Sequence, residues 1–584
     1  MRYIKPFIVV FLALVAGFTS CVQKPAALPR PKLVIGIVID QMRWDYLYRF
    51  YNLYGNDGFK RLMSGGYNCQ NTMVNYLPSF TGPGHTCIYT GSVPAIHGIS
   101  GNNWIDDTGR NWYCVEDADA KRYSDVISSG RSIPMSPNSL LVTTITDELR
   151  LGTNFRSRVF GIAIKDRGSI LPAGHLGNAA YYYNDSVFTT SKYYTEKYQN
   201  PAWLQAFNNR KLPDSLSHQH WQQYLADNSS YDLYSVVTGS YGKGFSNEVQ
   251  LPKPPYLHML DTTNPAGMRT ALKTMPAGNT YTLMMARACI EGEQLGQNGN
   301  TDFLAVSLSS TDYAGHQFGP NAKELEDMYL HLDNQIALML KYLDETMGKD
   351  NYLLFLTADH GGAHNATFLQ DNNIPAGVAN FGLNQQSKIN ALIKKDFYAT
   401  DALRKNATDA YKKNGDTLYK IVNITNYQAF LNSKLINNLG LDRNKIKDEV
   451  IDFLKKEQHV SFVTDMDNID KTPLPEPLRT MLINGYNNRR SGCIAYILDP
   501  AWYDYNIPTG TTHGTWNPYD AHIPLLWYGW HIPQGETNDL VNMTDISPTL
   551  AALLHIQSPN GCIGKPIKEI TDNKCVKKPS GAER

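Results

Sequence analysis

The strongest constraint in this sequence is a set of short, almost uninterrupted apolar runs that lead into acidic residues. One run, LVIGIVID, ends at Asp40, and two later ones are DFLAVSLSSTD over 302–312 and NYLLFLTADHG over 351–361. Runs of this length, rich in β-branched residues and without an alternating polar face, are typical of strands buried on both faces. Two shorter runs, RVFGIAIKD over 158–166 and IPLLWYG over 523–529, predict further strands.

The segment between the second and third runs, ELEDMYLHLDNQIALMLKYLDETM, has the apolar period of a helix. The order strand, helix, strand implies parallel strands joined by right-handed crossovers. We therefore predict an α/β fold with a central, mostly parallel sheet and helices on both faces. Two segments do not follow this alternation of strands and helices: a Tyr- and Asn-rich segment near 183–260 and an Asn- and Lys-rich segment near 365–500. We interpret both as inserted cap segments over the sheet.

The N-terminus has the pattern of an export signal. Arg2 and Lys5 precede an apolar run over 7–18 that is too short to cross a bilayer comfortably. Cys21 follows this run in a loose lipobox, so we expect a protein exported to the periplasm or cell surface and anchored to the membrane by a lipid on Cys21. Ordinary cleavage, with Cys21 uninvolved, is the alternative.

Charge and cysteine usage exclude two kinds of site. Lys plus Arg and Asp plus Glu are both 54, so no electrostatic preference for nucleic acid is visible and no nucleic-acid partner is expected. None of the eight cysteines forms a CxxC pair, which argues against a zinc ribbon built from thiolates.

Acidic and imidazole side chains stand where the predicted strands end. In open parallel sheets, ligands bind outside the carboxyl ends of the strands. Aspartate and histidine together suit zinc, and six ligands exceed the need of one tetrahedral ion, so the count predicts two metal ions. Each residue alone has a structural alternative, such as capping a helix, and only the joint pattern is specific. The six residues are Asp40, Asp312, His316, Asp359, His360 and His513.

Thr81 lies in PSFTGPGHTCIYTG, where a Gly-Pro-Gly break leads into a helix-like run. A hydroxyl at this place has two interpretations. It could cap the N-terminus of the helix, or it could act as a nucleophile on a bound substrate.

The segments around these residues resemble the alkaline phosphatase superfamily, and within it the phosphate-irrepressible, PafA-type alkaline phosphatases. The resemblance covers most of the mature chain. It rests on the region of Asp40 and on the segments TGPGHTCIYTGSVPAIHGISGNNW, AIKDRGSILPAGH, TDYAGHQFGP, TADHGG and THGTWNPYD. It implies that 33–574 form an alkaline-phosphatase-like catalytic domain containing the two cap segments. A signal peptide over 1–21 and a linker over 22–32 would precede this domain, and a C-terminal tail over 575–584 would follow it.

This resemblance implies a phosphate monoester hydrolase with two zinc ions per chain. One ion would be held by Asp312, His316 and His513. The other would be held by Asp40, Asp359, His360 and the hydroxyl of Thr81. Thr81 would attack phosphorus and form a phosphothreonine, which water then hydrolyses to release inorganic phosphate.

Three further residues are candidates for contacts with the phosphate. Lys165 and Arg167 are separated by one residue at a predicted strand end, so both side chains can point to the same side. A solvated salt bridge in a loop is the structural alternative for this pair, and Asn103 is an alternative to Asn102. The resemblance implies that Asn102, Lys165 and Arg167 contact phosphate oxygens. It also implies that this pair replaces the third metal of the classical alkaline phosphatases, so no third metal is expected.

Other functions compete with this prediction. A phosphodiesterase or nucleotide pyrophosphatase of the same superfamily would share the metal ligands but lack the Lys/Arg pair. A non-catalytic surface lipoprotein that binds glycan or metal would suit the Tyr- and Asn-rich segments. A sulfatase would need a Cys or Ser in a C/S-x-P-x-R context, which TGPGH does not provide. The expected partners are small phosphate monoesters, and the sequence gives no signal for the oligomeric state.

Overall fold

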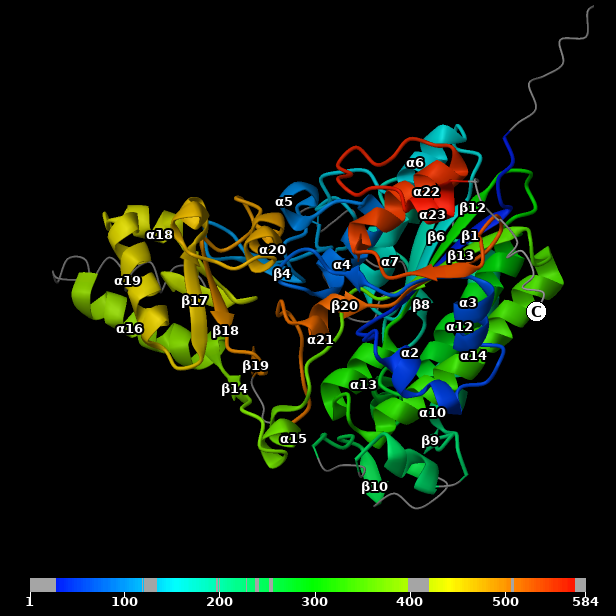
Figure 1. Ribbon diagram of the computed structural model, residues 1–584, viewed down its shortest axis with the longest axis horizontal. Coiled ribbons are helices and arrows are strands. Elements are labelled where there is room, and N and C mark those ends of the chain that lie inside the picture. The colour runs from blue at the N-terminus through cyan, green and yellow to red at the C-terminus, as the bar shows by residue number, and fades with distance from the viewer. Residues whose placement is uncertain are drawn as a thin grey trace, which may run out of the picture. The chain divides into compact units, whose positions relative to one another are not determined.

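The computed structural model describes residues 28–572 except 118, 120–133, 196–197, 199, 227, 237–240, 251–255, 398–419 and 506–508 (Figure 1). The elements all lie in the compact unit that begins at Pro31. The predicted signal with Cys21, most of the predicted linker and the predicted C-terminal tail lie outside the described residues. In the described part of the chain, none of the helices is both long and apolar enough to cross a membrane.

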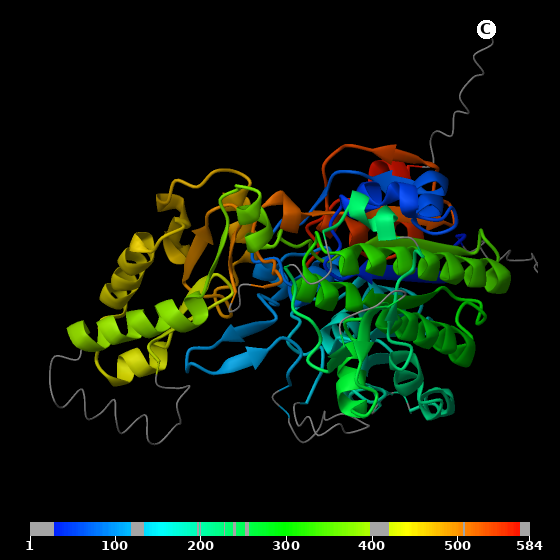
Figure 2. The same ribbon diagram turned by 90° about the horizontal axis from the view of Figure 1, so that it is seen from below.

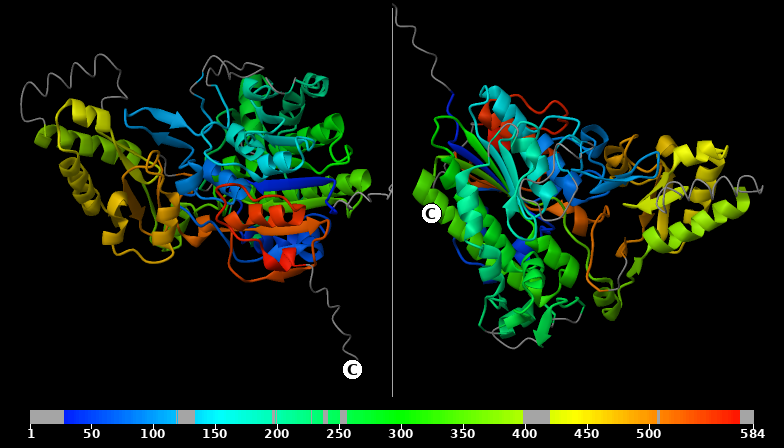
Figure 3. Two further views of the ribbon diagram at one scale, coloured as in Figure 1. Left: turned by 90° about the horizontal axis from the view of Figure 1, so that it is seen from above. Right: turned by 180° about the vertical axis from the view of Figure 1, so that it is seen from behind.

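Among the described residues, the main sheet has nine strands. Several of them lie side by side in the right-hand view of Figure 3. Their order is β22 (Gly535–Thr537), β2 (Tyr67–Cys69), β21 (Leu525–Gly529), β13 (Tyr352–Thr357), β1 (Leu33–Ile39), β12 (Asp302–Leu308), β6 (Val159–Ala163), β7 (Ala179–Tyr183) and β8 (Phe188–Thr189). The five strands from β13 to β7 are parallel, and β21 and β8 run antiparallel to their neighbours. Every residue of β1, β12 and β13 is buried. The predicted central, mostly parallel sheet is confirmed.

The strands are shorter than the sequence runs that predicted them. β12 ends at Leu308, where the apolar run ends, and the polar residues that follow begin helix α13 (Ser310–Phe318). β13 ends at Thr357, two residues before Asp359. The prediction of a strand through residue 312 is therefore wrong, and Asp312 lies in the first turn of a helix.

Helices cover both faces of the sheet, as predicted (Figure 1). The connection from β6 to β7 contains α7 (Asp166–Ala173), and the connection from β12 to β13 contains α14 (Lys323–Met347). These two connections run in opposite directions along the sheet, so right-handed crossovers place their helices on opposite faces. α14 packs with α12 (Pro276–Glu293) and α13, whereas α7 packs with α4 (Thr81–Thr90) and α6 (Ile145–Gly152).

The region near 365–500 builds a second hydrophobic cluster around its own antiparallel sheet. The sheet has the order β15 (Val422–Thr425), β16 (Gln428–Leu431), β18 (Ile494–Leu498) and β17 (Val460–Asp465), and α16 (Gln386–Phe397) and α19 (Arg443–Lys456) contribute to its cluster. The hairpin of β4 (Asn103–Ile105) and β5 (Asn111–Tyr113) reaches this region (Figure 2). Nδ2 of Asn426 donates to the main-chain oxygen of Asn103 at 2.6 Å.

We expect the central strand β1 to be sensitive to loss of volume. Ile37 is 1% exposed, so Ile37→Ala should cost about 2–5 kcal/mol of stability through lost burial and a residual cavity. A thermal melt should show a clear fall in melting temperature. Leu338→Ala on α14 is the matched control, because Leu338 is 55% exposed and should change stability by no more than about 0.5 kcal/mol. Equal melting temperatures for the two variants would contradict this packing.

Candidate metal centre

The ends of β1 and β13 bring two carboxylates and one imidazole together. These strands are parallel neighbours, so Asp40 after β1 and Asp359-His360 after β13 emerge at the same edge of the sheet. Nε2 of His360 lies 3.6 Å from Oδ1 of Asp40 and 3.4 Å from Oδ2 of Asp359. The hydroxyl of Thr81, the first residue of α4, lies 3.5 Å from the same nitrogen. All four side chains are buried.

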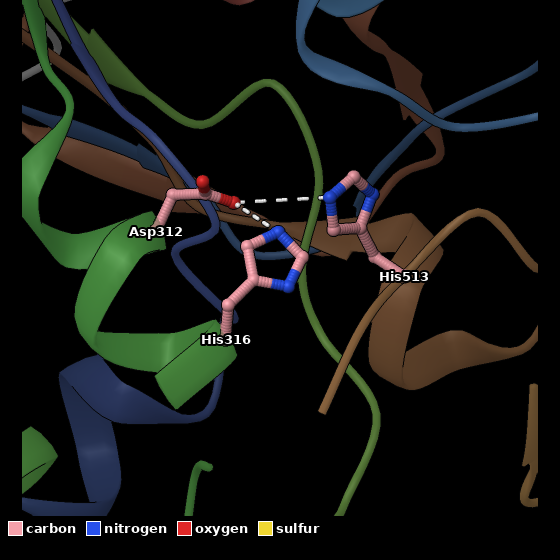
Figure 4. Close-up of side chains that lie close together, drawn as sticks. All are labelled: Asp312, His316 and His513. Carbon is pink, nitrogen blue, oxygen red and sulfur yellow. Dashed lines mark ion pairs between the residues drawn. The ribbon is translucent and has the colours of Figure 1, made fainter. Parts of the chain in front are cut away.

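A second group forms beside the first from α13 and a distant loop (Figure 4). Asp312 and His316 are four residues apart on α13, so both point to one side of the helix. Oδ1 of Asp312 lies 3.2 Å from Nε2 of His316 and 3.7 Å from Nε2 of His513, which comes from the loop before α21 (Pro518–Ala521). The rings of His360 and His513 stack with their centroids 3.6 Å apart, so the two groups adjoin.

Main-chain carbonyls orient all three imidazoles. Nδ1 of His316 lies 2.8 Å from the main-chain oxygen of Thr511. Nδ1 of His360 lies 2.9 Å from that of Gly361, and Nδ1 of His513 lies 2.7 Å from that of Ser79. A carbonyl only accepts hydrogen bonds, so each Nδ1 carries the proton and each Nε2 faces the carboxylates. Histidines that bind metals are oriented in this way.

Burial and neighbouring charges set the protonation of the imidazoles. Burial lowers the pKa of His360, and burial together with the other two imidazoles holds the pKa of His513 well below its usual range. Burial also acts to lower the pKa of His316, but the adjacent Asp312 carboxylate raises it overall. Two of the three rings are therefore neutral ligands even without a cation nearby.

The protonation of the three carboxylates depends on their burial and on the charges around them. Burial and the neighbouring Asp359 raise the pKa of Asp40 well above its usual range. Burial would also raise the pKa of Asp359, but the neighbouring His360 lowers it overall. Burial acts on Asp312 in the same way, but His316 and Lys165 hold the pKa of Asp312 well below its usual range. Within the described part of the chain, Oδ1 of Asp40 and Oδ2 of Asp359 are buried and accept no well-aligned hydrogen bond, although Nδ1 of His85 and Nε2 of His360 each lie 3.4 Å from Oδ2 of Asp359.

Unpartnered buried carboxylate oxygens are costly unless a cation neutralises them. In each of the two groups, one ligand atom per residue lies within 4.8 Å of the others. One group is Asp40, Asp359 and His360, with the Thr81 hydroxyl beside it, and the other is Asp312, His316 and His513. The donor set therefore fits metal ions, and all six predicted ligands lie in these two groups.

Lys165 lies between the two groups. It immediately precedes α7, is 4% exposed, and its Nζ donates to Oδ2 of Asp40 at 2.6 Å and to Oδ2 of Asp312 at 2.5 Å. Burial acts to lower the pKa of Lys165, but these two carboxylates raise it overall. Lys165 is thus a buried ammonium group that contacts one carboxylate from each metal group, which excludes the solvated loop salt bridge as its environment.

Asn102 and Arg167 also reach the neighbourhood of Thr81 and Lys165. Oδ1 of Asn102 accepts from the main-chain N–H of Gly82 at 2.7 Å, in the first turn of α4. Arg167 is close enough for its charge to act on the pKa of Lys165. Its Nη1 donates to the hydroxyl of Tyr113 at 3.1 Å, and among the described residues its buried Nε has no acceptor. An anion would provide that acceptor.

Thr81 does not cap its helix. The N-cap position is Phe80, and no side chain bonds to the free N–H groups from there. The hydroxyl of Thr81 instead faces His360. A Cβ atom at Gly84 would come within 2.7 Å of Cβ of Asp359, so a glycine is required for α4 to lie against the end of β13. The N-cap interpretation of Thr81 is wrong.

Two residues of the site escaped the sequence analysis. Gln41 is buried, and its Nε2 donates to Oδ1 of Asp312 at 2.8 Å while its main-chain N–H donates to Oδ1 of Asp359 at 3.2 Å. Its φ of 64° is strained for a residue with a side chain. Tyr113 holds Arg167 through its hydroxyl, which donates to Asp166. The only sequence signal was the position of Gln41 next to Asp40.

Comparison with known proteins is consistent with this geometry. A family model described as type I phosphodiesterase / nucleotide pyrophosphatase matches residues 34–520. A protein named alkaline phosphatase PhoV from Synechococcus elongatus is 47% identical over 549 residues, which cover 94% of each chain. A protein named calcium-transporting ATPase from Myroides odoratus is 44% identical over 96% of this chain and 98% of its own.

A third relative has a solved structure. The protein named alkaline phosphatase PafA from Elizabethkingia meningoseptica is 42% identical over 552 residues, which cover 94% of this chain and 96% of the relative. The crystal structure of wild-type PafA superposes with a TM-score of 0.83 over 93% of this chain and 100% of that chain. The fold therefore has a close structural counterpart over 93% of the chain.

Gln41→Ala should weaken metal binding without unfolding the protein, because Gln41 orients one carboxylate of each group. Loss of such an outer contact typically costs about 10–100-fold in metal affinity. Competition with a chelator at equilibrium measures the change. Gln70→Ala is the control, since Gln70 bonds to Glu536 at the surface. Equal affinities for both variants would show that Gln41 does not position the ligands.

Proposed function

The chain belongs to the type I phosphodiesterase / nucleotide pyrophosphatase family and is an alkaline phosphatase, and we propose that Thr81 is its nucleophile at a centre of two zinc ions. The observation that carries this proposal is the position of the Thr81 hydroxyl. It is buried at the N-terminus of α4, 3.5 Å from Nε2 of His360, in a group that also contains Asp40 and Asp359. A threonine used only for structure has no need of these neighbours.

The ligand chemistry favours zinc. Each group offers a mixture of carboxylate oxygens and imidazole nitrogens, which zinc accepts in tetrahedral sites that keep a position open. Zinc bound at these residues would lower the pKa of a nearby hydroxyl and neutralise charge on the phosphoryl oxygens. We propose that Asp40, Asp359, His360 and the Thr81 hydroxyl hold one ion, and that Asp312, His316 and His513 hold the other.

The remaining residues would bind and orient the phosphoryl group. The N-terminus of α4 presents a partial positive charge to an incoming dianion. Because Oδ1 of Asn102 is occupied by the Gly82 N–H, its Nδ2 group remains available to donate to a phosphate oxygen. The oxygen of Thr81 would bond to phosphorus as the bond to the alcohol breaks. Water would then cleave the phosphothreonine, release inorganic phosphate and restore Thr81.

Lys165 and Arg167 would set the preference of the enzyme for phosphate monoesters over phosphate diesters. A monoester dianion presents an additional anionic oxygen, and a diester has an alkyl group in that place. If cations were held at both ligand groups, they would neutralise Asp40 and Asp312, and the N–H donors of Lys165 would then be available to phosphate. The buried Nε of Arg167, which has no acceptor among the described residues, offers a second donor.

We also propose an organisation and location for the whole chain. The basic and apolar N-terminal sequence supports export, and the loose lipobox supports a lipid anchor on Cys21. The segments near 183–260 and 365–500 are proposed to be insertions in a single catalytic domain over 33–574.

Thr81→Ala should abolish most hydrolysis of p-nitrophenyl phosphate, because it removes the attacking oxygen. The other ligands remain, so metal analysis should still find about two zinc ions per folded chain. Thr81→Ser keeps the hydroxyl and should retain substantial activity. The measurements are phosphate release and metal content on the same preparations.

Near wild-type turnover in Thr81→Ala would exclude the covalent route. A wild-type content near one ion per chain, or magnesium alone, would exclude the two-zinc centre.

The double variant Lys165→Ala, Arg167→Ala should lose monoester hydrolysis selectively. Charge-assisted contacts to phosphate are each worth about 1.5–3 kcal/mol, so kcat/KM for an aryl phosphate should fall on the order of a hundredfold or more. The methyl diester of the same aryl phosphate should change little, because it lacks the additional anionic oxygen.

The assay compares both substrates in wild type and variant, with melting temperatures as the control for folding. Equal losses on the two substrates would mean that the pair supports the fold or the metals. Phosphodiesterase activity would then be preferred over phosphate monoester hydrolysis as the function of this site.

A further inference from the structure

A cavity of about 350 Å³ opens directly beside the metal centre. Its lining includes His316, a ligand of the second group, and Tyr313, which lies one turn earlier on α13. The ring of Tyr313 lies 5.2 Å from Nζ of Lys165, and the ring of Tyr505 stacks against His316 at 6.4 Å. A volume of this size accommodates a small organic molecule.

The cavity lies on the side of the leaving group. Displacement at phosphorus places the attacking and leaving oxygens in line, and two-metal centres stabilise one oxygen at each ion. Thr81 belongs with the group of Asp40, Asp359 and His360. The leaving oxygen must therefore emerge by the other group, which contains His316, and this is where the cavity begins.

The outer wall is attached firmly to α13. The main-chain N–H of Lys243 donates to the main-chain oxygen of Gln317 at 3.0 Å. A Cβ atom at Gly242 would come within 2.9 Å of the Cα atom of Phe318, so only glycine permits this approach. The ring of Phe245 packs on Phe318 at 5.9 Å between centroids. The segment 242–247 is thus held next to the helix that carries His316.

The lining combines apolar surface with several polar groups, and it carries one kind of charge. Thr274 and Gln317 supply hydroxyl and amide groups, and Nδ2 of Asn247 is buried without an acceptor in the described part of the chain. Tyr313 and Tyr505 add ring faces. Among the described residues, none of the lining side chains is a carboxylate. Lys243 is exposed to the cavity, and no ion pair to it is formed by the residues described.

We propose that this cavity receives the alcohol part of the substrate, and that Lys243 favours hydroxylated alcohols that carry an additional anionic group such as a carboxylate. This inference rests on the proposed phosphatase function. The hydroxyl and amide groups match the hydroxyls of such an alcohol, and the ammonium group of Lys243 attracts its negative charge. None of the described lining residues is a carboxylate that would repel this charge at the cavity wall.

The test uses two substrates that differ in one group, glycerol 3-phosphate and 3-phosphoglycerate, with p-nitrophenyl phosphate as a reference. Lys243→Ala should lower kcat/KM for the carboxylated substrate about two- to fivefold relative to glycerol 3-phosphate, because Lys243 is exposed and its ion pair is partly screened. Lys243→Glu should lower this ratio further. Lys243→Arg should preserve it. Added salt should reduce the wild-type ratio.

The control is Lys349→Ala, an exposed lysine just beyond the C-terminal end of α14 that should leave the ratio unchanged. A role of Lys243 in stability alone would affect all three substrates equally, and the ratio would then stay constant and overturn the proposal. In that outcome, continued hydrolysis of p-nitrophenyl phosphate would leave the phosphatase assignment intact. No phosphate release from any of the three substrates would overturn both.

Discussion

The concentration of negative charge at one edge of the sheet is the constraint on which the site depends. Asp40, Asp312 and Asp359 are all buried there, and in the described structure only one ammonium group, that of Lys165, contacts two of them. Burying three carboxylates with so little compensation is unfavourable. The arrangement is explained if cations complete it, and the same cations supply the electrostatics that phosphoryl transfer needs. The stability of the fold and the chemistry of the site would thus both require cations next to these carboxylates.

The surrounding structure holds the ligands in place around that charge. Main-chain carbonyls direct each Nε2 toward the carboxylates, and Gln41 connects the two groups from a strained backbone. Such strain persists only where neighbouring contacts over-determine it. Tyr113 likewise holds Arg167 in place by accepting a hydrogen bond from it. Tyr113 lies on the β4–β5 hairpin, which contacts the region near 365–500. The Lys/Arg pair and the nucleophile therefore depend on segments far apart in the chain.

Sequence patterns predicted the parts of the site that follow directly from strand ends. Asp40 and Asp359 terminate apolar runs, and parallel pairing of those runs brings them to one edge. The resemblance to PafA-type phosphatases added the grouping of six ligands and the contacts of Asn102, Lys165 and Arg167. Gln41 and Tyr113 carry no such pattern, because their roles arise from hydrogen bonds to residues more than fifty positions away. The cavity beside His316 likewise draws its walls from four separate segments.

The sequence by itself determined the α/β class and the main strands, because burial on both faces demands continuous apolar runs. It also supplied the aspartates and histidines whose chemistry suits a metal centre. Only the tertiary structure decided how these pieces act together. It placed the Thr81 hydroxyl toward His360 instead of at a helix cap, moved Asp312 from a strand into the first turn of α13, and set Lys165 between two carboxylates. Those outcomes depend on long-range packing, such as the approach of α4 to β13 at Gly84, which local propensity does not encode.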